Sequence, residues 1–298
     1  KKLGLRDRIL QDVAIPTGLE MRDALTAELI TRMPLGEDLT RRFGDTYAVI
    51  HRADLHNIIL DACRGQKNIT LETQARVMDF DDKGGEVVVT MEDGRTIVGA
   101  AMIGADGLWS KTRQKLVGDG KPRVSGHIAY RAVLKREDVP ADLWHPDVVL
   151  WAGPRTHLVH YPLRRGELYN LVAVFHSDHY VEGWDQAGDP ALLHQHFKGQ
   201  VPQVLRMLEK IDVWKMWVLC DREPVKDWSK GRATLLGDAA HPMLQYLAQG
   251  ACMALEDAVT LGEALRVHDN DWDKALQLYQ DSRVARTARI VLSGREMG

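Results

Sequence analysis

The stretch from residue 233 to residue 265 constrains the fold of this chain more than any other. The apolar run 233–236 predicts a buried strand, and it ends directly in Gly237 and Asp238. Residues 251–265 then repeat apolar side chains with the period of a helix. A strand that leads through Gly-Asp into a helix is typical of an α/β domain, in which ligands bind beyond the carboxyl ends of the strands. The sequence therefore predicts a ligand crevice beside Asp238.

Small residues surround this predicted crevice. Ala239 and Ala240 follow Asp238, and Gly250 and Ala251 begin the next helix, so a flat ligand can approach the backbone closely. The free N–H groups and the positive dipole end of that helix suit an anionic ring or a phosphate. The alternative is that Asp238 only caps a turn and that the glycines serve packing, since strand–Asp–helix units are common.

Two shorter motifs carry similar chemistry. Asp106 and Gly107 follow the apolar run 102–104, and Arg52 stands at the start of a helix predicted over 50–65, where a guanidinium can reach a phosphate. Taken singly, the Asp-Gly pair is also what an ordinary turn contains, and a helix-start arginine is usually solvated.

Together these motifs resemble a known family. His-Arg-Ala-Asp-Leu at 51–55, Gly-Ala-Asp-Gly-Leu-Trp-Ser-Lys-Thr-Arg at 104–113 and Gly-Asp-Ala-Ala-His-Pro at 237–242 are similar, in order and spacing, to the class A flavoprotein aromatic hydroxylases. The resemblance implies that Asp238 binds the ribityl chain of FAD, that Asp106 helps to bind FAD and the nicotinamide donor, and that Arg52 lies against FAD. It also implies that the segment after His241, with Gly250 and Ala251, lines the flavin.

The resemblance implies a composite α/β (α+β) fold like that of p-hydroxybenzoate hydroxylase, with an FAD-binding domain interleaved with a mostly antiparallel substrate domain. We expect the FAD-binding domain at 1–11, 46–120 and 229–298, and the substrate domain at 12–45 and 121–228. The family begins with a strand–GxGxxG–helix unit that cradles the FAD pyrophosphate, and these 298 residues contain no GxGxxG. A protein without that unit is expected to hold FAD poorly.

Within the family, residues 245–258 and 156–166 are most similar to 3-hydroxybenzoate 6-hydroxylases, which form gentisate. In those enzymes the positions of His157, Tyr161 and Gln245 surround the phenol, and a flavin C4a-hydroperoxide, formed from O2 after reduction by NADH or NADPH, delivers the oxygen. A histidine with a pKa near 6.5 can accept the phenolic proton near neutral pH. Alternation along the strand places His157 and Tyr161 on one face and His160 on the other, where a structural or solvated role is expected.

Composition limits the other possibilities. With 39 basic and 42 acidic residues the net charge is −3, which gives no support for nucleic-acid binding. We find no apolar run long enough for a membrane helix, and the three scattered cysteines form neither a disulfide framework nor a metal site. A cytoplasmic enzyme is therefore expected. The resemblance implies a homodimer, since these hydroxylases are often dimers. The alternatives are a salicylate or 6-hydroxynicotinate hydroxylase and a non-catalytic fragment that only binds a ligand.

Overall fold

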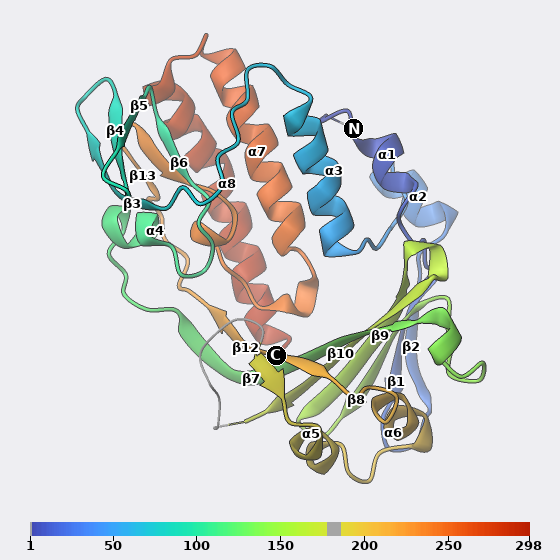
Figure 1. Cartoon of the computed structure of the whole chain (residues 1–298). Helices are drawn as coiled ribbons and strands as arrows, with labels where there is room; N and C mark the ends of the chain where they lie inside the picture. The colour runs from blue at the N-terminus through green and yellow to red at the C-terminus, as the bar shows by residue number, and fades with distance from the viewer. Residues whose placement is uncertain (1, 178–185) are drawn as a thin grey trace. The chain divides into compact units, whose positions relative to one another are not determined.

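The computed structural model describes residues 2–177 and 186–298, and the chain divides into two compact units (Figure 1). The first unit comprises Lys1–Thr70 and Gly126–Val218, and the second comprises Leu71–Ser125 and Leu219–Gly298. Each unit is therefore assembled from two separate stretches of sequence. Both contain helices and strands, which confirms the mixed α/β class predicted from the sequence. The division into cofactor and substrate domains stays a prediction.

The first unit is built on an eight-stranded sheet with the strand order β11-β12-β7-β10-β9-β8-β1-β2. Its strands are β1 (Gly18–Asp23), β2 (Leu29–Pro34), β7 (Arg123–Lys135), β8 (Val148–Gly153), β9 (Thr156–Leu163), β10 (Leu168–His176), β11 (Gln186–Gly188) and β12 (Trp214–Asp221). The pairs β8–β9, β9–β10 and β10–β7 are antiparallel, whereas β1 and β8 run parallel.

The two faces of this sheet differ in burial, and β9 shows the difference. Leu158 and His160 point to a buried face, whereas His157, Val159 and Tyr161 lie on the opposite, half-buried face. Helices α5 (Pro190–His196) and α6 (Pro202–Leu208) pack on the buried face. The core there includes Leu158, Leu171, Phe175, Leu193, Phe197, Val204 and Trp214. Three further helices of this unit are α1 (Arg6–Leu10), α2 (Glu37–Phe43) and α3 (Arg52–Arg64).

The second unit contains two three-stranded sheets and three helices. One sheet has the order β3-β4-β5 and the other β13-β14-β6. The strands are β3 (Val77–Asp82), β4 (Val87–Met91), β5 (Thr96–Gly99), β6 (Met102–Gly104), β13 (Ser229–Lys230) and β14 (Ala233–Leu235), and the helices are α4 (Lys111–Leu116), α7 (Gly250–Val267) and α8 (Trp272–Glu296).

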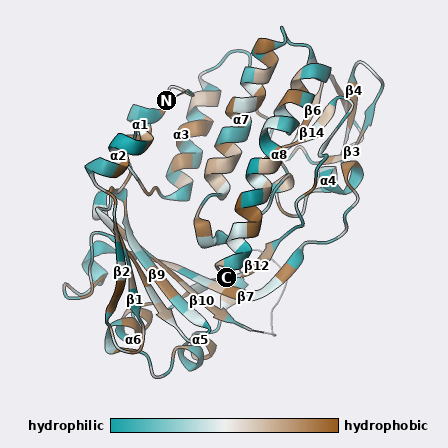
Figure 2. Cartoon of the chain, turned by 180° about the vertical axis from the view of Figure 1, so that it is seen from behind, coloured by the Kyte–Doolittle hydropathy of each residue, from teal (hydrophilic) through white to brown (hydrophobic). Residues whose placement is uncertain are grey.

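Helices α7 and α8 pack against each other and against the β13-β14-β6 sheet. Both helices alternate between hydrophobic and hydrophilic segments along their length (Figure 2). The buried residues of α8 include the apolar Leu276 and Tyr279 and the polar Gln280, Arg283 and Thr287. None of the helices in the described part of the chain has the length and apolar character that a membrane crossing requires.

The pattern of apolar residues also predicts strands over 69–80 and 96–103 and a helix over 191–208, and these three elements differ from the observed ones. The strand expected over 69–80 begins only at residue 77, because the preceding residues stay exposed and pair with no strand among the described residues. The strand expected over 96–103 is two strands that belong to different sheets. The helix expected over 191–208 is broken between α5 and α6, since Gly199 adopts a left-handed φ of +85° and Pro202 starts a new helix.

Candidate functional site

The β13-β14-β6 sheet brings two of the predicted site residues to the same edge. Strands β14 and β6 are parallel, with Leu235 opposite Gly104, and the Leu236 N–H donates to the Gly104 carbonyl at 2.9 Å. Asp106 and Asp238 each follow one of these strand ends within three residues. Asp106 and Asp238 therefore both lie beyond the carboxyl ends of neighbouring parallel strands, which is where ligands bind in open α/β sheets.

Two glycines make this edge possible. Gly237 has φ +62°, a left-handed conformation, and a Cβ there would lie 3.2 Å from the Ala254 Cβ on α7. At Gly104 a Cβ would lie 2.5 Å from the Thr112 Cγ2. The turn after β14 thus packs directly on α7, and the end of β6 packs directly on the start of α4.

Asp238 has an exposed side chain beside the start of α7. Within the described part of the chain its carboxylate accepts no hydrogen bond, so it does not cap the turn in which it lies. A Cβ built on Gly250 would lie 3.9 Å from Asp238 Oδ1, and the first turn of α7 has no side-chain cap. An exposed carboxylate next to uncapped helix N–H groups can accept from a hydroxyl while those N–H groups donate to the same ligand.

Asp106 is used differently. Its Oδ1 accepts from the Ser110 hydroxyl at 2.5 Å, and its Oδ2 accepts from the Thr112 N–H and hydroxyl, both at 3.1 Å. Burial raises the pKa of Asp106, but these hydrogen bonds outweigh burial and leave the pKa below its usual value. The carboxylate fixes the start of α4, and its predicted contact with a cofactor stays a prediction.

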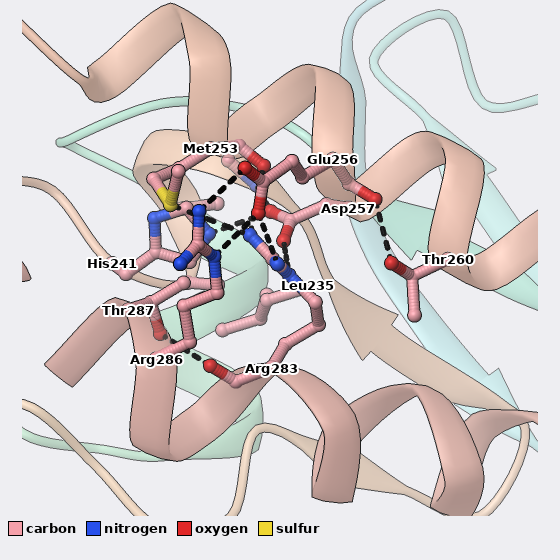
Figure 3. A network of polar contacts seen from close by, with 12 residues as sticks. Leu235, His241, Met253, Glu256, Asp257, Thr260, Arg283, Arg286 and Thr287 are labelled. Atoms are coloured by element: carbon pink, nitrogen blue, oxygen red, sulfur yellow. Dashed lines mark hydrogen bonds and ion pairs between the residues drawn. The ribbon is translucent and has the colours of Figure 1, made fainter. Parts of the chain in front are cut away.

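A buried carboxylate on α7 holds the turn after β14 in place (Figure 3). Asp257 Oδ2 accepts from the Gly237 N–H at 2.9 Å and lies 2.6 Å from His241 Nε2. Its Oδ1 accepts from Arg283 Nε at 2.7 Å, and the Asp257 side chain has no exposed surface. Asp257 therefore accepts hydrogen bonds from the backbone of the turn after β14 and from two side chains.

Glu256, one residue earlier, continues this network toward the surface. Its carboxylate accepts from Arg283 Nη1 at 2.6 Å and from both Arg286 Nε and Nη2, at 2.7 and 2.8 Å. These two arginines hold the pKa of Glu256 well below its usual value, at about 2. The network crosses from α7 to α8, so these helices fix the Gly237 turn together.

Arg113 supports the same turn from the other side. Its guanidinium is fully buried and donates from Nη1 to the carbonyls of Ala239 and Ala240, at 3.1 and 2.5 Å. Asp119 accepts from its Nε and Nη2 at 2.9 and 2.6 Å. Arg113 is the last residue of the motif at 104–113, and the motif alone indicates no role for it. The structure shows that Arg113 fixes the backbone after Asp238.

In the first unit, His160 is structural. Trp151 Nε1 donates to His160 Nε2 at 2.9 Å, so the imidazole proton sits on Nδ1 and is donated to the Tyr169 hydroxyl at 2.7 Å. Burial lowers the pKa of His160 to about 3, with smaller contributions from His145 and Arg22. His160 thus stays neutral in the core, as expected for the buried face of β9.

The pKa of His157 differs from the value near 6.5 expected from the sequence. Burial, with repulsion from His127 and His176, lowers its pKa to about 4 rather than leaving it near 6.5. At neutral pH the imidazole is therefore neutral and a weak base. It can accept a hydrogen bond from a phenol, but it does not hold the phenolic proton at equilibrium.

The low pKa values of His157 and His160 predict a pH-dependent stability. The unfolded imidazoles bind a proton below about pH 6.5 and the folded ones do not, so stability rises with pH between about 4 and 6.5. Between pH 7 and pH 5 we expect each imidazole to lower the free energy of unfolding by about 2 kcal/mol. In urea denaturation, the decrease in the free energy of unfolding between pH 7 and pH 5 should be about 2 kcal/mol smaller for His157→Gln than for the wild type. If the decrease in His157→Gln were unchanged, or if the control His56→Gln, at an exposed position of α3, reduced the decrease equally, the low pKa would be contradicted.

Arg52 is exposed in the first turn of α3. Its neighbour Asp54 pairs with Arg164, with the Arg164 Nε and Nη2 atoms 2.8 and 2.7 Å from the carboxylate oxygens. This pairing ties the start of α3 to the turn that follows β9. Arg164 is therefore engaged by a carboxylate, while the contact of Arg52 with a cofactor stays a prediction.

Gln245 lies in the second unit, in the 3₁₀ turn Gln245–Leu247 that precedes α7, and its side chain is half-buried. Ala248 closes this turn in a left-handed conformation with φ +52°. The structure thus brings Gln245, Asp238, Gly250 and Ala251 into one segment around the start of α7, and His157 and Tyr161 onto one face of β9.

One group of possible metal ligands occurs among the described residues, formed by Glu20, His145 and Asp147. Arginines already neutralise both carboxylates, since Arg22 Nη2 lies 2.8 Å from Glu20 and Arg32 Nη2 lies 2.8 Å from Asp147. His145 Nδ1 accepts the Asp147 N–H at 3.2 Å. The lone pairs that a cation needs are engaged, so this group is an ion-pair cluster.

Comparisons with a family model, with curated relatives and with solved structures all match this chain to FAD-binding proteins or to hydroxylases. A family model described as FAD binding domain matches residues 1–293. The 3-hydroxybenzoate 6-hydroxylase of Polaromonas naphthalenivorans (strain CJ2) is 47% identical over 296 residues, covering 99% of this chain and 74% of the relative. The enzyme of the same name from Klebsiella oxytoca is 45% identical with the same coverage. Among solved structures, Klebsiella pneumoniae HpxO complexed with FAD and uric acid matches with a TM-score of 0.88 and 25% identity, over 99% of this chain and 74% of that one.

Proposed function

This chain belongs to the FAD binding domain family, as a class A flavoprotein hydroxylase, and from this we propose its function. It is then an FAD-dependent, NAD(P)H-consuming monooxygenase that adds one hydroxyl group to a phenolic aromatic acid. The substrate we propose is 3-hydroxybenzoate and the product is gentisate. The observation that carries this proposal is the high identity, along almost the whole chain, to relatives named for that reaction.

The residues at the end of β14 and at the start of α7, in the second unit, have the chemistry needed to bind FAD. Asp238 offers an exposed carboxylate for the hydroxyls of a polyol chain, and the uncapped N–H groups at Gly250 and Ala251 offer donors to an electron-rich ring. Asp106 and Arg52 keep the cofactor roles that their motifs imply. The chemistry supplied by bound FAD is the activation of O2, at the expense of NADH or NADPH, for transfer of one oxygen atom to the aromatic ring.

The roles of the chain's own residues follow from their chemistry. His157, neutral at pH 7, accepts the hydrogen bond of the phenolic hydroxyl and so raises the electron density of the ring. Burial raises the pKa of Tyr161, so its hydroxyl stays protonated and acts as a donor that orients the ring. Gln245 supplies a neutral hydrogen bond to the phenolic hydroxyl. Attack para to that hydroxyl gives the 2,5-dihydroxy product, so orientation decides the outcome.

A product assay tests the proposed substrate. We expect the full-length protein with FAD and NADH to convert 3-hydroxybenzoate to gentisate, and to convert salicylate and 6-hydroxynicotinate far more slowly. Faster turnover of either of the latter would remove 3-hydroxybenzoate as the substrate. NADH and O2 consumption without any oxygenated product would remove the hydroxylase assignment itself.

Asp238→Ala should weaken FAD binding by about 10- to 100-fold, since a charge-assisted hydrogen bond contributes about 1.5–3 kcal/mol. Titration of the apoprotein with FAD, followed by flavin fluorescence, measures this loss. The control Asp273→Ala removes a carboxylate that pairs with Arg232 on the same unit and should leave FAD affinity unchanged. Equal affinity of the Asp238 variant and the wild type would contradict the role given to Asp238.

The proposal extends to assembly and location. A homodimer is supported by the edge strand β2, where Leu29, Ile30 and Met33 are each about half exposed, at 49%, 53% and 50%. A cytoplasmic location is supported by the cysteines, which form no disulfide bond among the described residues. Light scattering of the purified protein tests the first point, because a monomer at micromolar concentration contradicts it.

A further inference from the structure

Two neighbouring strands of the first unit present matching rows of side chains on one face of the sheet. On the half-buried face of β9 these residues are His157, Val159 and Tyr161. The residues directly opposite them on β10 are, in the same order, Val174, Val172 and Asn170. Side chains that are directly opposite across neighbouring strands share a face, with their Cβ atoms about 4.5–5.5 Å apart. Asn170 therefore lies beside Tyr161, at the end of this face that is farthest from His157.

Asn170 is more accessible than the two valines beside it on this face. Val172 and Val174 are 9% and 2% exposed, whereas Asn170 is half-buried. On β7, Val133 lies directly opposite Asn170 and is 45% exposed, so the face is open beside the amide. A ligand that packs its apolar part on the valines can therefore reach the amide with a polar group.

Both polar groups at this end can donate to a ligand. Within the described part of the chain, neither the Asn170 amide nor the Tyr161 hydroxyl makes a side-chain hydrogen bond or an ion pair. Burial raises the pKa of Tyr161, so its hydroxyl keeps the proton and acts as a donor. The half-buried amide has given up part of its water, and a ligand that offers an acceptor restores the lost hydrogen bond. The two donors lie side by side, which suits a group with two acceptor oxygens.

We propose that the amide of Asn170, together with the hydroxyl of Tyr161, binds the carboxylate of the aromatic acid and makes the site selective for acids over neutral phenols. This inference rests on the proposed function, because it assigns the acid group of that substrate. Each donor pairs with a carboxylate oxygen, and hydrogen bonds to an ionised acceptor are roughly twice as strong as those to a neutral one.

The assignment also gives the substrate a fixed direction on the sheet. The aromatic ring lies on Val159 and Val172, which separate the two polar ends of this face. Its carboxylate points to Asn170 and Tyr161, and its hydroxyl points to His157. The reversed orientation would put the carboxylate against a neutral imidazole, which offers fewer donors than the amide and the phenol together.

Asn170→Asp tests the inference, since aspartate has the same size and replaces the donor with a negative charge. Calorimetric titration of the FAD-loaded full-length protein measures the binding of 3-hydroxybenzoate and of its neutral analogue 3-hydroxybenzamide. The wild type should prefer the acid, and Asn170→Asp should weaken acid binding by about 100-fold, because two carboxylates then repel each other. Binding of the benzamide should change less than about threefold, because its carboxamide group can donate to the new carboxylate.

A second variant and a control separate charge from structure. Asn170→Leu removes the amide without adding a charge, and it should weaken acid binding by about 10-fold. Asn57→Asp adds the same charge at an exposed position of α3, in the same unit, and should leave both affinities unchanged.

Two results would overturn the inference. Equal effects of Asn170→Asp on the binding of both ligands, whether losses, gains or none, would show that Asn170 does not recognise the carboxylate. A wild type that binds the acid no more tightly than the benzamide would show that this end of the face does not select an acid. The proposed function fails separately, when wild-type protein that discriminates the acid from the benzamide forms no gentisate.

Discussion

Asp257→Ala is expected to lower the free energy of unfolding by about 3–5 kcal/mol, the largest loss of stability that we predict. The carboxylate is fully buried and joins the Gly237 N–H, His241 and Arg283. Its removal leaves the buried Gly237 N–H and the Arg283 Nε–H without their acceptor, and Arg283 keeps only its carboxylate partner Glu256. Urea denaturation at pH 7 measures the loss, and Asp281→Ala, on the exposed face of α8, is the matched control.

The same variant should also bind FAD more weakly, because the turn that carries Asp238 would no longer be fixed. Asp257→Asn separates the two effects: the amide oxygen can still accept from Gly237, but the negative charge opposite Arg283 is lost. We expect intermediate stability and FAD affinity close to that of the wild type. A change in stability of less than about 1 kcal/mol in Asp257→Ala would contradict the role given to this network.

His157→Ala should slow hydroxylation of 3-hydroxybenzoate by about 100- to 1000-fold, the largest effect on turnover that we predict. Flavin reduction by NADH should stay within a few-fold of wild type, because the phenolic hydroxyl takes no part in that step. Rapid-mixing absorbance measurements of the two half-reactions separate them. Equal losses in both would show that His157 does not act on the phenol.

The pH dependence gives a second test of His157. The neutral imidazole is the active form, so its contribution is lost as pH falls through the folded pKa of about 4 rather than near 6.5. Hydroxylation in the enzyme–substrate complex should therefore stay constant between pH 7 and pH 5.5. A loss of rate centred near pH 6.5 that disappears in His157→Gln would contradict the low pKa.

Part of the fold and of the site could be predicted because its signals are local. The strand before Gly237, the start of α7 and the alternation that separates His157 from His160 are all set by a few consecutive residues. The positions of Asp106 and Asp238 at one sheet edge follow from the same strand–Asp pattern occurring twice. The broken helix between α5 and α6 also has a local signal, in Gly199 and Pro202, which a helical period alone overlooks.

The supporting contacts could not be predicted, because they join residues far apart in sequence. Arg113 reaches carbonyls 126 and 127 positions away, and Arg283 meets Asp257 across 26. Nothing in the local sequence distinguishes these arginines from solvated ones. The lowered pKa of His157 likewise depends on burial in the folded unit, and to a smaller extent on His127 and His176.

The most direct test of the account is the visible spectrum of the full-length protein, recorded with FAD alone and after addition of 3-hydroxybenzoate. We expect bound flavin absorbance that shifts and saturates with the acid, because the ligand changes the environment of the flavin ring. A colourless protein that cannot be reconstituted with FAD would contradict the cofactor crevice beside Asp238. A flavin spectrum that is indifferent to 3-hydroxybenzoate would contradict the substrate.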